Sequence, residues 1–259
     1  MARTSVTRFS AGSNSVRTTA ISGDTVNSND VIRIPGLTIS PNSNWTLVKL
    51  INPVGDGSYF NMTFYSQADG TGVGRSWMTS PLVGRFWTSA LGGMTRNSNQ
   101  LPILNSWQWV VYTNTYNSGA NTNDLNMYFM PLRAAFAISI GSFLGIAAYE
   151  EANGEHHIGA NKLTPAGFGA DAYFGHFQFF SRTLTQAEVS QRCTRNSFSR
   201  SNLECEYLFT ESSGSTVKDT SGNGRDGILV DGAAFSLVSP FPARAIVATR
   251  TPVLSRVVV

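Results

Sequence analysis

The feature that most constrains the fold of this chain is a series of short apolar stretches, each bounded by residues that favour turns. The segments between them, such as NPVGDG and NSGANTND, are dense in residues that accept positive φ or form side-chain turns. Several of the stretches alternate in polarity, as half-buried strands do. They read DVIRI, WTLVKLI, YFNMTFYS, WQWVVYTN, DLNMYFM, FAISI, LGIAAY, FGHFQFF and LECEYLF. Many short strands predict an all-β sandwich or jelly roll.

One segment, TLTQAEVSQRC, has the start signal of a helix. Thr185 can accept a hydrogen bond from the amide of Glu188, and the Glu188 carboxylate can reach back to the amide of Thr185, which is a capping box. Leu184 and Val189 occupy the positions of a hydrophobic staple around it. We therefore predict a single short helix from about residue 186 to 193.

The two ends of the chain differ from its body. Residues 1–23 are rich in Ser, Thr, Ala and Arg without a sustained period, and residues 243–259 are apolar and basic, so we predict an extended arm at each end and one domain over residues 24–242. Neither arm contains an acidic residue, which suits contact with a partner subunit. The predicted partner-binding arginines are Arg3, Arg8, Arg17, Arg244, Arg250 and Arg256.

The overall charge and hydropathy exclude several classes of partner. A net charge of +3 is too small to indicate nucleic acid. The first residues contain no apolar run that would serve as a signal peptide, and no segment resembles a membrane span. We expect a chain made in the cytoplasm without export through a signal peptide.

Four segments resemble those of a known family, the laminin-G-like or concanavalin A-like jelly rolls found in bacterial surface and phage structural proteins. DVIRIPGLTISPNSNWTLVKLINP and SWQWVVYTN resemble its early and central strands. FGHFQFFSRTLTQAEVSQ resembles its strand followed by a short helix, and LFTESSGSTVKDTSGNGRDGIL resembles the segment that normally opens the domain. That last segment stands near the C-terminus here. It therefore either completes the sandwich in a circularly permuted arrangement, which we prefer, or begins a truncated second copy.

Candidate catalytic residues are few. Glu150 and Glu155 are the best pair of carboxylates, but Asn153 and Gly154 predict a turn between them, so we interpret the segment as a hairpin tip. His176 lies in an alternating strand and is interpreted as a polar strand residue. No nucleophile elbow, P-loop or dinucleotide glycine pattern is present. We predict a chain that is not an enzyme.

One loop has a partial calcium pattern. Asp219, Ser221 and Asn223 occupy the first ligand positions of a calcium loop, and Gly224 the turn position. The final position, where such a loop has Glu, is Val230. Calcium at Asp219, Ser221 and Asn223 is set against a plain polar turn, and no other cofactor is expected.

Cys193 and Cys205 are the only cysteines. Two thiols do not supply a zinc site by themselves. They are interpreted as two reduced thiols, with a single disulfide bridge as the alternative.

Two functions remain. The resemblance and the arms favour a phage virion protein, a capsid decoration or cement protein that binds the major capsid protein or other virion subunits and is itself a possible homo-oligomer. The alternative is a carbohydrate-binding adhesion module of a tail fibre or a surface lectin, with Trp77 and Trp87 stacking on a glycan. The interpretation of the same two tryptophans as core or inter-sheet residues is the preferred one.

Overall fold

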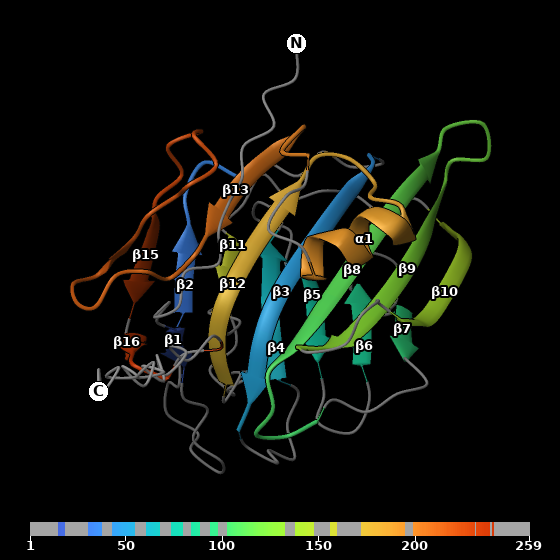
Figure 1. Cartoon of the computed structure of the whole chain (residues 1–259). Helices are drawn as coiled ribbons and strands as arrows, with labels where there is room; N and C mark the ends of the chain where they lie inside the picture. Colours follow the sequence, from blue (N-terminus) through green and yellow to red (C-terminus); the bar gives the residue numbers. More distant parts are fainter. Residues whose placement is uncertain are drawn as a thin grey trace, which may run out of the picture.

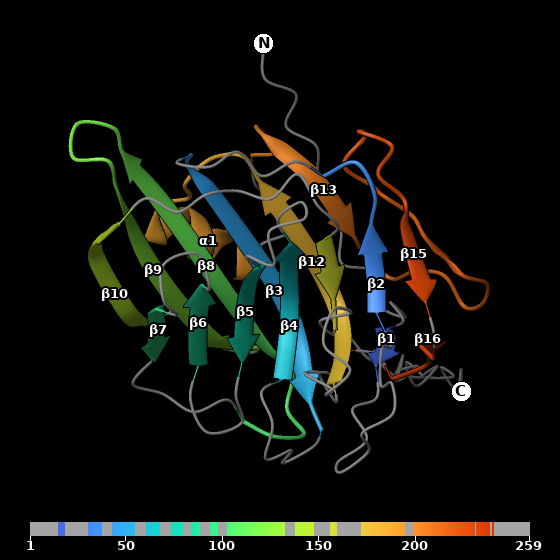
Figure 2. The same cartoon turned by 180° about the vertical axis from the view of Figure 1, so that it is seen from behind.

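Two antiparallel β-sheets pack face to face in this protein, and one helix lies on the outer side of one of them (Figure 1). The second sheet is seen from behind in Figure 2. The computed structural model describes residues 15–18, 31–37, 43–54, 61–67, 74–79, 84–88, 94–97, 103–132, 138–147, 156–159, 172–194, 199–230, 232–238 and 240. Within these residues there are sixteen strands and one helix. The predicted all-β sandwich with one short helix is confirmed.

Sheet 1 contains the longer strands. Its order is β10 (Ile138–Ala147), β9 (Thr122–Pro131), β8 (Gln108–Asn117), β3 (Trp45–Pro53), β12 (Ala172–Phe180), β1 (Ser15–Thr18) and β16 (Ala234–Ser236), with β13 (Leu203–Tyr207) also paired to β12. β1 pairs with the first residues of β12 and β13 pairs with its last residues. The two short strands therefore lie end to end along one side of β12.

Sheet 2 is built from shorter strands. Its order is β14 (Thr216–Val217), β15 (Gly227–Val230), β2 (Val31–Ile34), β11 (His156–Ile158), β4 (Asn61–Gln67), β5 (Gly74–Thr79), β6 (Gly84–Thr88) and β7 (Met94–Asn97). Both sheets are therefore assembled from strands that lie far apart in the sequence.

The central strands of sheet 1 are buried on both faces, because each face is covered by a different element. Towards sheet 2, residues such as Leu47, Tyr112 and Phe177 form the core between the sheets. On the outer face, Val48 and Trp109 belong to a second cluster, which α1 (Gln186–Thr194) covers. Burial on both faces explains why apolar residues occupy both alternating sets of positions in β3.

The local sequence of α1 fixes where it begins. The amide of Thr185 donates to Glu188 Oε2 at 2.9 Å, and the amide of Glu188 donates to Thr185 Oγ1 at 3.3 Å. Leu184 and Val189 are both buried in the outer cluster. The predicted capping box and helix are confirmed. No helix among the described residues is long and apolar enough to cross a membrane.

The two cysteines are free and buried. Cys205 of β13 lies in the core between the sheets, whereas Cys193 of α1 lies in the outer cluster. Sheet 1 therefore separates the two thiols. The interpretation as reduced thiols is confirmed, and the alternative of a bridge between them is wrong for this fold.

The segment after the helix contributes to both sheets. β13 pairs with β12 in sheet 1, and β15 pairs with β2 in sheet 2. The segment therefore completes this sandwich and does not begin a second one. The circular permutation relative to other proteins stays a prediction.

Part of the predicted N-terminal arm is a strand of the sandwich. In β1, Arg17 is paired with Tyr173 on one side and with Ala234 on the other. An isolated run of four residues between polar segments has too weak a period to be recognised, and its pairing is supplied by strands far along the chain. The prediction that all of residues 1–23 lie outside the body is therefore corrected for residues 15–18. The remaining predicted arginines, Arg3, Arg8, Arg244, Arg250 and Arg256, lie outside the described residues.

Candidate functional site

The outer face of sheet 1 carries a short row of aromatic and amide side chains, which we call the aromatic row. Asn52 of β3 is paired with Tyr173 of β12. On the other side of β3 lies β8, in which Gln108 is paired with Ile51. Trp107 directly precedes Gln108, so in this antiparallel pair it lies opposite Asn52. Residues directly opposite each other share a face of a sheet, and Trp107, Asn52 and Tyr173 therefore form a single row across three strands.

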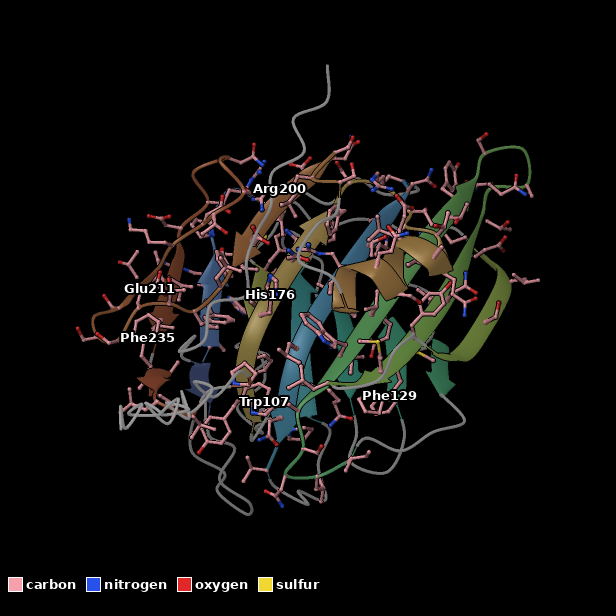
Figure 3. The ribbon with its side chains drawn as sticks, viewed as in Figure 1. Trp107, Phe129, His176, Arg200, Glu211 and Phe235 are labelled. Carbon is pink, nitrogen blue, oxygen red and sulfur yellow. The ribbon has the colours of Figure 1, made fainter. Side chains whose placement is uncertain are left out.

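The two rings of the row meet at an angle. The centroids of Trp107 and Tyr173 are 6.4 Å apart, and their planes are inclined by 48°. Both side chains are half-buried, so part of each ring is open to solvent. Figure 3 shows Trp107 towards the lower end of sheet 1, away from α1. The pair forms an aromatic corner on a rigid sheet.

Gly175 makes room for the Trp107 ring. The register between β12 and β3 shifts between Phe174 and His176, as at a β-bulge, and Gly175 is the residue left without a partner there. A Cβ atom at Gly175 would lie 3.0 Å from the Trp107 ring and 2.7 Å from Cγ of Pro240. Only a residue without a side chain allows the ring to lie so close to the strand.

The row is bordered by Arg17 of β1, which is paired with Tyr173, and by several uncharged residues. Asn52 Oδ1 is buried and has no hydrogen-bond partner within the part of the chain that the structure describes. The amide of Leu132 donates to the carbonyl of Trp107 at 3.2 Å, and Ile103 nearby in sequence is 48% exposed. The row can therefore offer a ligand the exposed parts of two aromatic rings.

Further along the same face, α1 covers a buried charged cluster centred on Glu206 of β13, which we call the Glu206 cluster. Arg192 Nη2 donates to Glu206 Oε1 at 3.1 Å, and Arg200 Nη1 donates to Oε2 at 2.6 Å. His176 Nε2 lies 3.3 Å from Oε1, and the side-chain amide of Gln178 donates to the same oxygen. Arg192 also donates to Gln178. The cluster joins α1, β12, β13 and the segment before β13.

The pKa values of Glu206 and His176 both lie below their ordinary values. Burial acts to raise the pKa of Glu206, but the hydrogen bond with His176 and the charges of Arg192 and Arg200 outweigh it and hold the pKa well below its usual range. Burial lowers the pKa of His176 against the attraction of Glu206. At neutral pH Glu206 is therefore ionised and His176 is neutral. With every Glu206 oxygen occupied by protein donors, we assign the cluster to stability.

The loop with the partial calcium pattern is held by hydrogen bonds instead of being arranged for a cation. Asp219 Oδ1 accepts from the amides of Glu206 and Ser221 at 3.0 and 2.9 Å. Its Oδ2 accepts from the Ser221 hydroxyl at 2.8 Å and from the amide of Arg225 at 2.9 Å. Asn223 directs its amide nitrogen at two carbonyls of β13. The structure brings Asp219, Ser221 and Asn223 together, but their oxygens are used by donors, so the predicted calcium loop does not fit and the plain polar turn does.

Among the described residues, no group of His, Cys, Asp and Glu is arranged to hold a metal ion. The carboxylates Glu150 and Glu155 lie outside the described residues. Trp77 of β5 and Trp87 of β6 are not paired with each other, because Trp77 is opposite Phe86 and Trp87 is opposite Ser76. Their side chains lie outside the described part of the structure, so the predicted glycan contact through them stays a prediction.

Comparison with known proteins supports the fold. No protein-family model matches the sequence, and no curated protein sequence matches it. A candidate carbohydrate-binding protein of Bacteroides ovatus has a TM-score of 0.61 and 14% identity, over 90% of this chain and 62% of the other. The chain thus spans less than two thirds of that protein. A heptameric SAP-like pentraxin of Limulus polyphemus has a TM-score of 0.55 and 12% identity, over 89% of this chain and 97% of the other.

A lower similarity links the chain to domains LG4-5 of the mouse laminin α1 chain, with a TM-score of 0.45 and 11% identity over 72% of this chain and 46% of the other. The two sheets, the helix among the described residues and the first two neighbours define a concanavalin A-like β-sandwich. The predicted fold class is confirmed. At these identities the neighbours show the fold alone.

The sequence reasoning missed the aromatic row. Trp107 and Trp109 alternate in SWQWVV, and only Trp109 is fully buried. The signal that identifies Trp107 is its position at the polar start of a strand, close in space to a glycine that interrupts the alternating pattern of AYFGHFQFF. That signal becomes readable only when β8, β3 and β12 are known to be neighbours.

Proposed function

We propose that this chain is a carbohydrate-binding domain and that its glycan lies on the aromatic row. The observation that carries the proposal is the aromatic corner of Trp107 and Tyr173, half-buried and fixed on the outer face of sheet 1. One face of a pyranose ring presents C–H groups, and such a face packs on the electron-rich face of an aromatic ring. The similarity to a candidate carbohydrate-binding protein supports the same function.

The rigidity of the row favours binding without rearrangement. Trp107 packs against the outer hydrophobic cluster, and its ring lies against the backbone of Gly175. Fixed aromatic side chains lose little conformational entropy when a ligand binds, so more of the contact energy is available as affinity. The proposal includes no catalytic step.

The test begins with the full chain on a glycan array, followed by titration calorimetry with the best ligand. Tyr173→Ala is expected to weaken the affinity by about tenfold, because a stacking contact of this kind contributes on the order of 1 kcal/mol or slightly more. Tyr116→Ala is the matched control, because Tyr116 is also half-buried but lies at the end of β8 that is remote from Trp107. Its hydroxyl donates a hydrogen bond to Asn121 Oδ1 at 3.0 Å.

Saturable binding that Tyr173→Ala weakens and Tyr116→Ala leaves unchanged would support the proposal. The absence of saturable binding to any glycan on the array would overturn it. The predicted decoration role in a virus particle, with capsid subunits as partners, stays a prediction, because no described residue and no neighbour above bears on it.

A further inference from the structure

A small pocket opens on the outer face of sheet 1, between α1 and the end of β12. It has a volume of about 60 Å³. One ordered water needs about 15 Å³ of such volume, so the pocket has room for about four water-sized groups. Phe180, Leu184 and Arg192 in its wall are buried, whereas Gln191 and Ser199 at its rim are exposed. The lining residues are Phe180, Arg182, Leu184, Glu188, Gln191, Arg192 and Ser199.

Two guanidinium groups of the pocket lie near the same aromatic ring. The Cζ atoms of Arg182 and Arg192 lie 5.9 and 5.7 Å from the centroid of Phe180. Arg192 is held from below by Gln178 and Glu206. Both cations are therefore fixed beside the pocket before any ligand arrives.

Arg182 is the more accessible of the two arginines. Its side chain is 24% exposed; Nη1 is 2.8 Å from Glu188 Oε1, and Nε donates to the carbonyl of Ser201 at 3.1 Å. Glu188 Oε2 accepts from the amide of Thr185. The one carboxylate that lines the pocket is thus already engaged by protein donors.

The charges and donors of the lining suit an anion. Two arginines and one glutamate line the pocket, and Glu206, paired with Arg192, lies behind the lining together with Arg200. Gln191 at the rim carries an amide that can donate, and Ser199 a hydroxyl. Guanidinium groups favour planar oxyanions, because two parallel N–H groups match the two oxygens of a carboxylate. A carboxylate with one further carbon is within the size that the pocket admits.

We propose that this pocket binds the carboxylate group of a small organic anion. The proposal goes beyond the glycan site, because Phe180 lies roughly 20 Å along β12 from Tyr173 of the aromatic row. A uronic acid and the C-terminus of a peptide both present such a carboxylate. The ligand that binds more tightly identifies the source.

The experiment titrates the full chain with sodium glucuronate and, separately, with N-acetylglycine, and follows amide chemical shifts by NMR at constant ionic strength. Arg182→Gln is expected to weaken the tighter of the two ligands by about tenfold, since it removes a charged donor. Glu188→Gln is expected to strengthen the binding of the same ligand several-fold, because it removes a negative charge that repels the ligand's carboxylate. The glutamine side chain still completes the capping box. Lys218→Gln, which removes one exposed positive charge elsewhere, is expected to leave the affinity unchanged.

Several results would overturn the proposal. They are the absence of saturable shifts with both ligands, equal weakening by Arg182→Gln and Lys218→Gln, a Glu188→Gln variant that does not bind more tightly, or sulfate binding as tightly as either carboxylate. Circular dichroism of each variant establishes that it is folded. Binding at the aromatic row is measured with different variants, so the two proposals succeed or fail separately.

Discussion

Replacing Glu206 by glutamine is the sharpest test of how this sandwich is stabilised. The side chain is fully buried, and its charge faces Arg192, which is 1% exposed, and Arg200, which is 17% exposed. The substitution preserves the size of the side chain but leaves two guanidinium groups without their shared counter-charge. Removing one partner of a buried ion pair costs about 3–5 kcal/mol. Because a domain of this kind is stable by roughly 5–15 kcal/mol in total, the loss is readily measurable.

The effect of Glu206→Gln is expected to depend on pH. The folded-state pKa of Glu206 is held well below 4.5, the ordinary value for a glutamate, so its charge stabilises the folded state fully above that value. As pH falls from there towards the folded-state pKa, the unfolded chain takes up the proton first and the contribution is lost. The difference between the variant and the unaltered protein is therefore largest near neutral pH and shrinks in acid.

The assay is urea denaturation followed by circular dichroism at neutral pH and at several acidic values. Glu204→Gln is the matched control on the same strand, because the Glu204 carboxylate is 27% exposed and pairs with the partly exposed Arg225 at 3.2 Å. Such a pair contributes about 0–1 kcal/mol. A Glu206→Gln variant no less stable than Glu204→Gln at neutral pH, or a difference that does not shrink in acid, would refute the reasoning.

Three further results are expected. Thr185→Ala removes the N-cap hydroxyl of α1 and should lower the free energy of unfolding by about 1 kcal/mol, measured by urea denaturation. Gly175→Ala places a Cβ atom 3.0 Å from the Trp107 ring, so it should cost about 1–3 kcal/mol and change the tryptophan fluorescence; an unaltered spectrum would contradict the packing. Burial raises the pKa of Cys193 and Cys205, so neither thiol should react with a disulfide reagent in the native protein, whereas both should react in guanidinium chloride.

The fold could be predicted because its signals are local. Strands such as β8 and β9 are long enough to show their pattern, and turn residues mark their ends. The helix was predicted from Thr185 and Glu188, whose hydrogen bonds lie within one turn. Signals of this kind need no knowledge of which strands become neighbours.

The Glu206 cluster could not be predicted, because its members come from separate elements. His176 belongs to β12, Arg192 to α1 and Glu206 to β13, and each alone reads as an ordinary polar residue. In the alternating pattern a polar position indicates a solvent-facing side chain. Here α1 covers that face, so the same position is buried.

The calcium pattern failed for a different reason. The spacing of Asp219, Ser221 and Asn223 was read correctly, but spacing does not show which atoms point inward. Asn223 turns its amide nitrogen to the carbonyls of β13, and Asp219 serves backbone amides. A loop that closes on its own backbone and a loop that closes on a cation have the same residue types.

The position of β1 has a consequence for the order in which the protein is assembled as it leaves the ribosome. Ser15 pairs with Ser236 and Arg17 pairs with Tyr173, so β1 waits for strands made much later. At ordinary rates of translation the delay is on the order of 10–40 seconds. During that time β1 has no partner in its final sheet, and sheet 1 is complete only after residues 234–236 have been synthesised.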